Sequence, residues 1–182
     1  MAKGRAFTLV ELLVVIAVVG LLVGLLLPAV NAGRRLARKT ECANNLSQLG
    51  VALRSYTATH EVYPPGVVNE SGPVQSAPVG YHFGWITQIL PYVEQKNLAR
   101  RFNPRASVYD GANETARQNL VGVLICPEDP TTGSARSAGV GGPSSYAACY
   151  HHREAPIDAD NSGVFFLNSK IRDDDIKDGL AY

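Results

Sequence analysis

The stretch Arg5-Ala6-Phe7-Thr8-Leu9-Val10-Glu11 opens a long apolar segment and decides how this chain of 182 residues is built. From Leu12 to Gly33 no residue carries a charge. A helix of about 22 residues is roughly 33 Å long, which matches the ~30 Å hydrocarbon core of a bilayer. The sequence therefore predicts a transmembrane helix near the start of the chain.

A secretory signal peptide is the other common explanation for a basic start followed by an apolar run. Lys3 and Arg5 supply the basic start, but signal peptides have apolar cores of roughly 7 to 15 residues and small residues at the cleavage site. The run here is longer, and no A-x-A sequence follows it. Two residues are unusual: Glu11, directly before the run, carries a carboxylate that is costly in hydrocarbon unless it is paired or near an interface, and Pro28, within the run, should loosen the helix.

The short basic leader, followed by Phe7-Thr8-Leu9-Val10-Glu11 and an apolar helix, resembles the N-terminal processing signal of type IV pilins and type II secretion pseudopilins. The resemblance implies that a prepilin peptidase removes a leader of residues 1–6. It would cut between Ala6 and Phe7 and methylate the new amine of Phe7. Ala6 stands where this family usually has Gly, and a cut after Gly4 is the weaker alternative.

The same resemblance implies assembly roles for Glu11 and Pro28, which become the fifth and twenty-second mature residues. In the family, the glutamate neutralises the N-terminal amine of a neighbouring subunit. N-methylation keeps the positive charge of the Phe7 amine, and an unpaired carboxylate in an apolar bundle is penalised, so this pair can set the register of assembly. The alternative is that Glu11 merely lies among lipid headgroups.

The resemblance thus implies a structural subunit of a type IV pilus-like or type II secretion-like filament. Its partners would be other copies of itself, related pilins, the prepilin peptidase and the bacterial inner membrane, with a single span and a periplasmic head. No enzymatic role is expected, since the sequence has no G-x-S-x-G, P-loop or G-x-G-x-x-G motif. The alternative function is an anchored periplasmic binding module that does not polymerise.

The charges around the span favour the opposite orientation. The positive-inside rule would place the C-terminal side in the cytoplasm, because four basic residues follow the span and only Lys3 and Arg5 precede it. We give the processing motif precedence, because it requires a cytoplasmic leader. We expect the basic cluster to contact anionic lipid, and we expect no nucleic acid on the head. The cluster is Arg34, Arg35, Arg38 and Lys39.

A second resemblance covers nearly the whole chain. Its motifs are similar to those of a large bacterial family that joins a prepilin-type N-terminus to a head of unknown function, often called secretion protein G-like. Members normally continue past an Asp-Gly such as Asp178-Gly179, so we expect a truncated or short member. The motifs are Cys42-Ala43-Asn44-Asn45-Leu46-Ser47-Gln48-Leu49-Gly50, Tyr63-Pro64-Pro65-Gly66, Ile89-Leu90-Pro91-Tyr92 and Cys126-Pro127.

Helical periodicity continues beyond the transmembrane segment of residues 7–33. An apolar stripe at spacings of three and four predicts an amphipathic continuation over residues 34–60 that packs on a sheet of the head. Consecutive prolines after Tyr63 end any helix, so the head is expected over residues 61–182. The stripe consists of Cys42, Leu46, Leu49, Leu53 and Tyr56.

The head is predicted to be α+β, with a small antiparallel sheet beneath the long helix. Loop composition is found at 129–144. Helices are predicted at 84–90, 91–101 and 113–119, and β-branched and aromatic residues predict strands at 121–126, 145–150 and 163–167.

Three cysteines are an odd number for an exported protein. Cys126 and Cys149 lie on predicted strands of one small domain, so a disulfide between them is predicted, with Cys42 left on the helix. Three unbridged thiols are an equal alternative. Cys149 and His151 share a strand face, but that spacing by itself implies no catalysis.

The sequence from Asp158 to Gly163 matches the first half of an acidic calcium loop. Asp158, Asp160 and Ser162 would supply oxygen ligands, but Ser169 stands where such a loop has a bidentate Glu. We therefore favour a simple turn over a calcium site, and expect no other cofactor.

Overall fold

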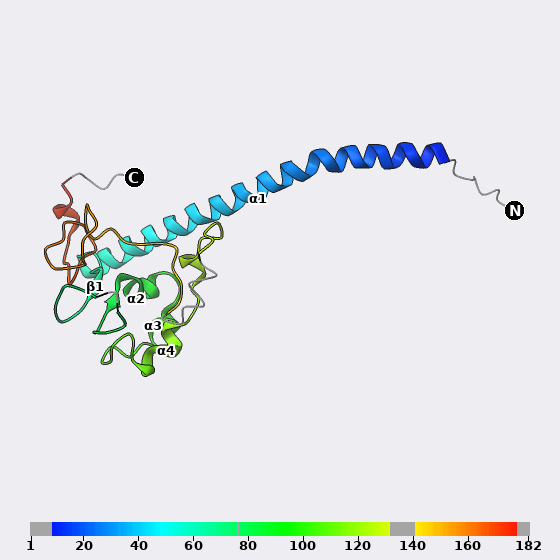
Figure 1. Cartoon of the computed structure of the whole chain (residues 1–182). Helices are drawn as coiled ribbons and strands as arrows, with labels where there is room; N and C mark the ends of the chain where they lie inside the picture. The colour runs from blue at the N-terminus through cyan, green and yellow to red at the C-terminus, as the bar shows by residue number, and fades with distance from the viewer. Residues whose placement is uncertain (1–8, 76, 132–140, 178–182) are drawn as a thin grey trace.

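A computed structural model describes residues 9–75, 77–131 and 141–177. Helix α1 (Leu9–His60) dominates it, and its first half projects far beyond the head (Figure 1). The prediction of one long helix is confirmed. Pro28 lies inside α1 without ending it.

Local sequence explains where α1 continues and where it ends. Thr57 and Thr59 donate their hydroxyls to the carbonyls four residues earlier, at 3.0 and 2.9 Å, so these polar side chains are satisfied within the helix. After His60, the backbone of Glu61 adopts a left-handed φ of 61°. The helix cannot resume there, because Pro64-Pro65 lacks backbone donors.

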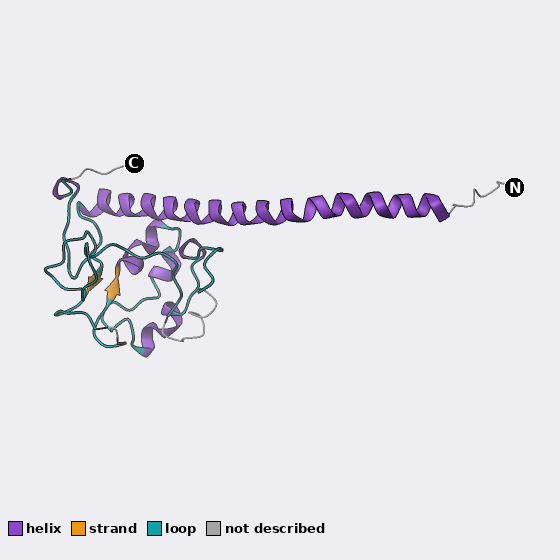
Figure 2. Cartoon of the chain, turned by 45° about the horizontal axis from the view of Figure 1, so that its top comes forward, coloured by secondary structure: helices purple, strands orange, loops and turns teal. Residues whose placement is uncertain are grey.

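The head is built from short elements joined by long loops (Figure 2). Strands β1 (Val67–Val68) and β2 (Phe83–Gly84) form an antiparallel pair, with Val67 opposite Gly84. The fold is therefore α+β, as predicted. The helical elements are α2 (Trp85–Ile89), η1 (Leu90–Tyr92), α3 (Lys96–Ala99), α4 (Gly111–Arg117), η2 (Gly122–Leu124) and η3 (Asp173–Asp175).

The predicted helices of the head are largely confirmed. α2 occupies the segment predicted at 84–90, and α4 begins two residues before the segment predicted at 113–119. The helix predicted at 91–101 is divided between η1 and α3. Asp110 caps α4 by accepting a hydrogen bond from the Ala112 amide at 2.8 Å.

The three strands predicted at 121–126, 145–150 and 163–167 are wrong. The first contains the 3₁₀ helix η2, and no named strand lies in any of the three, all of which the structure describes. One backbone hydrogen bond, from Ser145 to Leu124 at 2.8 Å, joins the first two segments, and two, from Gly163 to Tyr150 at 2.9 Å and from Phe165 to Cys149 at 3.1 Å, join the last two. Leu167 forms an isolated bridge to Val67. The β-branched and aromatic residues of the three segments reflect burial, which strand propensity largely measures, and not a ladder.

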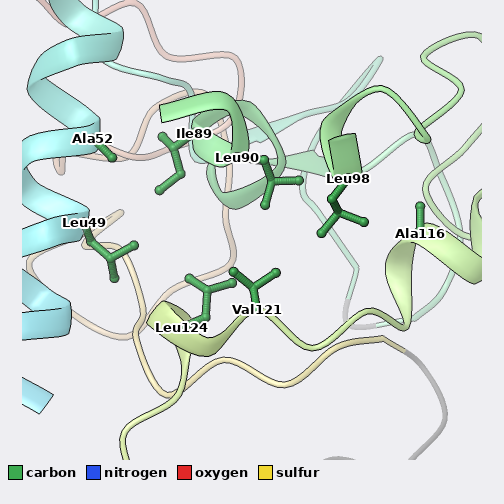
Figure 3. Packing of buried hydrophobic residues seen from close by; sticks show 8 residues of the cluster. All are labelled: Leu49, Ala52, Ile89, Leu90, Leu98, Ala116, Val121 and Leu124. Atoms are coloured by element: carbon green, nitrogen blue, oxygen red, sulfur yellow. The ribbon is translucent and has the colours of Figure 1, made fainter. Parts of the chain in front are cut away.

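One hydrophobic core joins α1 to the head. Leu49 and Ala52 point from α1 toward the short elements (Figure 3), and both are at most 2% exposed. The main contacts of α1 in the head are with α2, η1 and η2, so its buried face packs mainly on short helices. The prediction that it packs on a sheet is wrong. The other core members are Ile89, Leu90, Leu98, Ala116, Val121 and Leu124.

The predicted stripe on α1 needs one correction. Leu46 is 59% exposed, while Asn45 and Ala52 are buried. The contact face therefore follows positions 42, 45, 49, 52 and 56, which are spaced alternately by three and four. Hydrophobicity alone places Leu46, and not Asn45, on the face that contacts the head.

Candidate assembly helix and its junction with the head

The first half of α1 is an apolar surface that the head does not cover. Every Leu, Ile and Val from Leu9 to Val30 is at least 47% exposed. Such a continuous patch marks a membrane or protein contact, because soluble monomers seldom expose large apolar surfaces. Within the part of the chain that the structure describes, α1 is also the one helix long and apolar enough to cross a membrane.

Two of the predicted assembly residues lie on this surface. Glu11 is exposed in the first turn of α1, where the helix dipole favours a negative charge. Pro28 lies near the end of the apolar segment. The predicted processing residues Ala6 and Phe7 lie outside the described residues, so the cleavage position stays a prediction.

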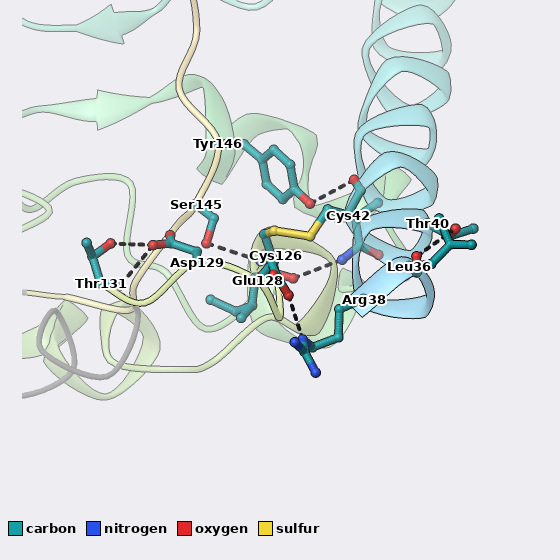
Figure 4. Close-up of a disulfide and its surroundings, with 12 residues drawn as sticks. Leu36, Arg38, Thr40, Cys42, Cys126, Glu128, Asp129, Thr131, Ser145 and Tyr146 are labelled. Atoms are coloured by element: carbon teal, nitrogen blue, oxygen red, sulfur yellow. Dashed lines mark hydrogen bonds and ion pairs between the residues drawn. A yellow bond between two sulfur atoms is a disulfide. The ribbon is translucent and has the colours of Figure 1, made fainter. Parts of the chain in front are cut away.

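A disulfide fixes the second half of α1 to the head (Figure 4). Cys42 and Cys126 are bonded, with their Cα atoms 4.8 Å apart and 84 positions apart in the sequence. Beside the disulfide, Arg38 Nε lies 2.6 Å from Glu128 Oε2. This ion pair is partly exposed, so the covalent bond is the stronger constraint.

Neutral hydrogen bonds complete this junction. The side-chain amide of Asn45 donates to the Ile125 carbonyl at 2.9 Å. The hydroxyl of Tyr146 donates to the Cys42 carbonyl at 3.0 Å. Asn45 is buried, and its bond to the backbone offsets the cost of removing a polar group from water. Two loops distant in sequence, around 125 and 146, therefore meet the same turn of α1.

The predicted disulfide between Cys126 and Cys149 is wrong. Cys126 pairs with Cys42, and Cys149 is an exposed free cysteine. The hydrogen bond from Asn45 to Ile125 holds the residue before Cys126 against α1. The sulfur of Cys126 therefore lies beside that of Cys42. The sequence contained a signal for this pairing: Cys42 lies two helical turns before Leu49, on the face that the head covers.

Aromatic groups hold the C-terminal end of α1. Tyr56 stacks on His60 with ring centroids 4.2 Å apart, and Tyr92 meets Tyr56 edge-on at 5.8 Å. Burial, and to a lesser extent the neighbouring Tyr92, raises the pKa of Tyr56. The neutral Tyr56 hydroxyl donates to Gln88 Oε1 at 3.1 Å. α1 is thus attached to the head at both ends of their contact.

In the segment that resembles a calcium loop, several oxygens that could bind a cation take part in local hydrogen bonds. Asp158 Oδ1 accepts from the Ala159 amide at 2.7 Å, and Asn161 Oδ1 accepts from the Asp158 amide at 2.8 Å. Ser162 Oγ lies 3.0 and 2.8 Å from Nδ1 of His151 and His152. The described residues include no group of three or more His, Cys, Asp or Glu that could hold a metal. Calcium binding through Asp158, Asp160 and Ser162 stays an untested alternative to the simple turn that the sequence favours.

An apolar helix that projects from a small α+β head, and is cross-linked to it, fits a domain that is anchored in a membrane. Residues 1–27 match the family model described as "Prokaryotic N-terminal methylation motif", which identifies a type IV pilin-like or pseudopilin precursor. Residues 31–182 match the model described as "Protein of unknown function (DUF1559)". The chain belongs to this second family, whose model covers most of its length. No curated protein and no solved structure matches the chain.

Proposed function

We propose that this protein is a structural subunit of a type IV pilus-like or type II secretion-like filament. Its stalks would bundle through the surface from Leu9 to Val30, with the heads facing outward. Other copies and related pilins would be its partners, and the prepilin peptidase would process it in the bacterial inner membrane. The head would lie in the periplasm before assembly.

The observation that carries this proposal is the exposure of the first half of α1 in a chain that bears the methylation motif. A membrane covers that surface before assembly, and a bundle of identical helices can cover it afterwards, because both surroundings are apolar. The rigid junction between α1 and the head supports the bundle of identical helices. With α1 cross-linked to the head through Cys42, each head is held in a constant position relative to its stalk.

In the bundle, Glu11 is proposed to pair with the methylated Phe7 amine of a neighbouring subunit. A carboxylate surrounded by apolar side chains is strongly penalised unless it is paired. Only subunits at the correct axial offset bring the two charges together. The pair would therefore select the register of the filament, while the apolar surface supplies the binding energy.

The processing step can be tested by mass spectrometry of the native N-terminus. We expect a mature protein that begins with N-methylated Phe7, because this cut makes Glu11 the fifth residue. An intact Met1, or a start beyond Val30, would contradict the proposal. A start at Arg5 would favour the weaker cleavage position after Gly4.

The assembly step can be tested with Glu11→Gln, which keeps the shape of the side chain and removes its charge. We expect normal insertion but at least a tenfold loss of subunits from sheared filaments, because the neighbouring amine loses its partner. Glu41→Gln is the matched control, since Glu41 is an exposed carboxylate on the same helix beyond the apolar segment. Equal incorporation of both variants would show that the Glu11 pairing is wrong. A processed wild-type protein that never appears in filaments would favour the anchored binding module.

The basic residues after the apolar segment fit a lipid contact. Arg34, Arg35 and Lys39 are exposed on α1. Arg38 differs from them because its side chain reaches Glu128. Before assembly, the three exposed cations would lie at the headgroups of anionic lipids and anchor the head close to the membrane.

A further inference from the structure

The head contains an open cleft that the filament role does not use. Its volume is about 760 Å³, within the ~300–1,000 Å³ range of small-molecule sites. It lies beside β1, β2 and α2, and the loops around 142 and 156 complete its walls. Those walls are mainly apolar and aromatic, and include Trp85, Tyr150 and Ile157. Such surroundings favour an organic ligand over a bare ion.

A smaller apolar annex adjoins the cleft and enters the hydrophobic core. Its volume is about 150 Å³, and it shares wall residues with the cleft, including Ile86, Val108 and Arg117. An apolar cavity of about 150 Å³ lined by Leu, Ile and Phe is large enough to bind benzene. The annex has this kind of lining and can therefore take a body of phenyl size. Its deeper walls are Leu90, Leu98, Phe102, Ala116, Val121 and Leu124.

The charges of the lining residues indicate which polar group a ligand of this site would carry. Arg117 is the one Arg or Lys among the described residues that line the cleft and annex, and no Asp or Glu is among them. Its guanidinium carbon lies 5.6 Å from the ring centroid of Tyr109. Burial lowers the pKa of His82, whose Nδ1 lies 3.3 Å from the Tyr109 hydroxyl. The described residues of the site therefore carry a positive charge at neutral pH, which suits an anion.

Arg117 is positioned at the boundary between the two spaces. It ends α4 and lines both the cleft and the annex. Its carbonyl accepts a hydrogen bond from the Gly142 amide at 2.6 Å, and a Cβ added at Gly141 would lie 3.3 Å from the Arg117 Cγ. A guanidinium has five N–H donors in a planar fork, so it can receive a carboxylate while keeping its contacts within the protein.

We propose that this cleft binds a small organic acid, with its carboxylate on Arg117 and an apolar body of phenyl size in the annex. Tyr109 and Tyr150 contribute mainly their ring faces, because the Tyr109 hydroxyl meets His82 and the Tyr150 hydroxyl donates to the Ala155 carbonyl. The site goes beyond the filament role and does not depend on it. A subunit that fails to polymerise would still bind the acid.

The single tryptophan of the chain, Trp85, lines the cleft, so its fluorescence reports on binding directly. The full-length protein in non-ionic detergent micelles would be titrated with 3-phenylpropionate, its neutral amide and propionate, with correction for uptake by empty micelles. We expect a saturable change with 3-phenylpropionate. The amide should bind about 10- to 100-fold more weakly, since it forfeits charge-assisted hydrogen bonds, and propionate should be weaker because it leaves the annex unfilled.

Variants then assign the two parts of the site. Arg117→Gln should lower the affinity for 3-phenylpropionate about 10- to 100-fold. Arg105→Gln is the matched control, because Arg105 is exposed and does not line the cleft. Ala116→Leu should fill the annex, so it should lower the affinity for 3-phenylpropionate but not the affinity for propionate. Thermal unfolding checks that each variant folds, and the ligand comparison in the unmodified protein needs no variant.

Three outcomes would overturn the proposal. Equal binding of the acid and its amide would show that Arg117 does not recognise a carboxylate here. The absence of a saturable change up to the solubility limit of 3-phenylpropionate would show that the cleft does not bind this class of ligand. Tighter binding of N-acetyl-Ala-Ala-Phe would reassign the carboxylate to the end of a polypeptide and contradict a small acid.

Discussion

Between Leu9 and Val30, α1 exposes every large aliphatic side chain, whereas between Cys42 and Tyr56 the same helix buries one narrow face against the head. Both halves are α-helical, although Pro28 donates no backbone hydrogen bond in the first. What differs is the distribution of apolar residues. They surround the first half on all sides, which suits lipid or a helical bundle, whereas the buried ones on the second half form a single stripe, which suits a one-sided contact.

The comparison shows that one helix can serve two surroundings without a break. The first half can exchange one apolar environment for another, because its contacts are not directional. The second half is tied to one partner by a disulfide, a buried amide and close packing. Changes in the second half should therefore affect the stability of the head, and changes in the first half should affect assembly.

The largest expected effect separates two leucines on the second half. Leu49→Asp should lower the free energy of unfolding of the head by about 3–5 kcal/mol, because a carboxylate would enter the core. Leu46→Asp is the matched control, with an expected change below about 0.5 kcal/mol, since Leu46 is 59% exposed. Thermal unfolding of the full-length protein in micelles, followed by near-ultraviolet circular dichroism, measures both. Equal midpoints would mean that α1 does not pack on the head through Leu49.

The disulfide should have the next largest effect. Replacing both Cys42 and Cys126 by Ser should cost about 2–5 kcal/mol, because the bond closes a long loop of 84 positions. Cys149→Ser should change the midpoint little, because that thiol is free and exposed. A Cys149→Ser loss as large as that of the double variant would instead support the pairing first predicted from the sequence.

The ion pair beside the disulfide should contribute less. Arg38→Gln should cost at most about 1 kcal/mol, because both side chains are partly exposed and the pair is screened by salt. Arg35→Gln, which removes an exposed cation one turn away, serves as the control. The difference between the two midpoints should shrink at high salt, and a difference that salt leaves unchanged would contradict a screened surface pair.

The smallest expected effect is a pH dependence confined to the head. Burial lowers the pKa of His82 in the folded protein, so the unfolded chain binds more protons below its ordinary pKa. Stability supplied by neutral His82 is present above about pH 6.5 and is lost as the pH falls toward its folded value. The unfolding midpoint should drop between about pH 7.5 and about pH 5.5, and His82→Gln should reduce that drop. An identical drop in the variant would assign the effect to other groups.

The first half of α1 provides an internal control for the pH experiment. No residue from Leu12 to Gly33 can titrate. Its helicity in micelles, measured by far-ultraviolet circular dichroism, should stay constant over the same pH range. Loss of that helicity together with the head would show that the two halves are more strongly coupled than their surfaces indicate.

Much of the head could not be predicted, because its short segments are defined by distant contacts. Strand patterns at 121–126, 145–150 and 163–167 were read from β-branched and aromatic residues, which also occur in buried loops. The cleft was missed for the same reason. Arg117 lies more than 30 positions after His82 and Trp85, and only the packing of the loops brings the three residues to one site.

The long helix, its apolar first half and its end near residue 60 could be predicted from the sequence. These features depend on residues within a few turns of one another: a run without charge, a 3.6-residue period and consecutive prolines. Three other features follow from tertiary packing: the bond between Cys42 and Cys126, the burial of Asn45 in place of Leu46, and the position of Arg117 at a cleft. Each of these depends on contacts between segments that are distant in the sequence or on which face of a helix the core selects, and local pattern does not determine either.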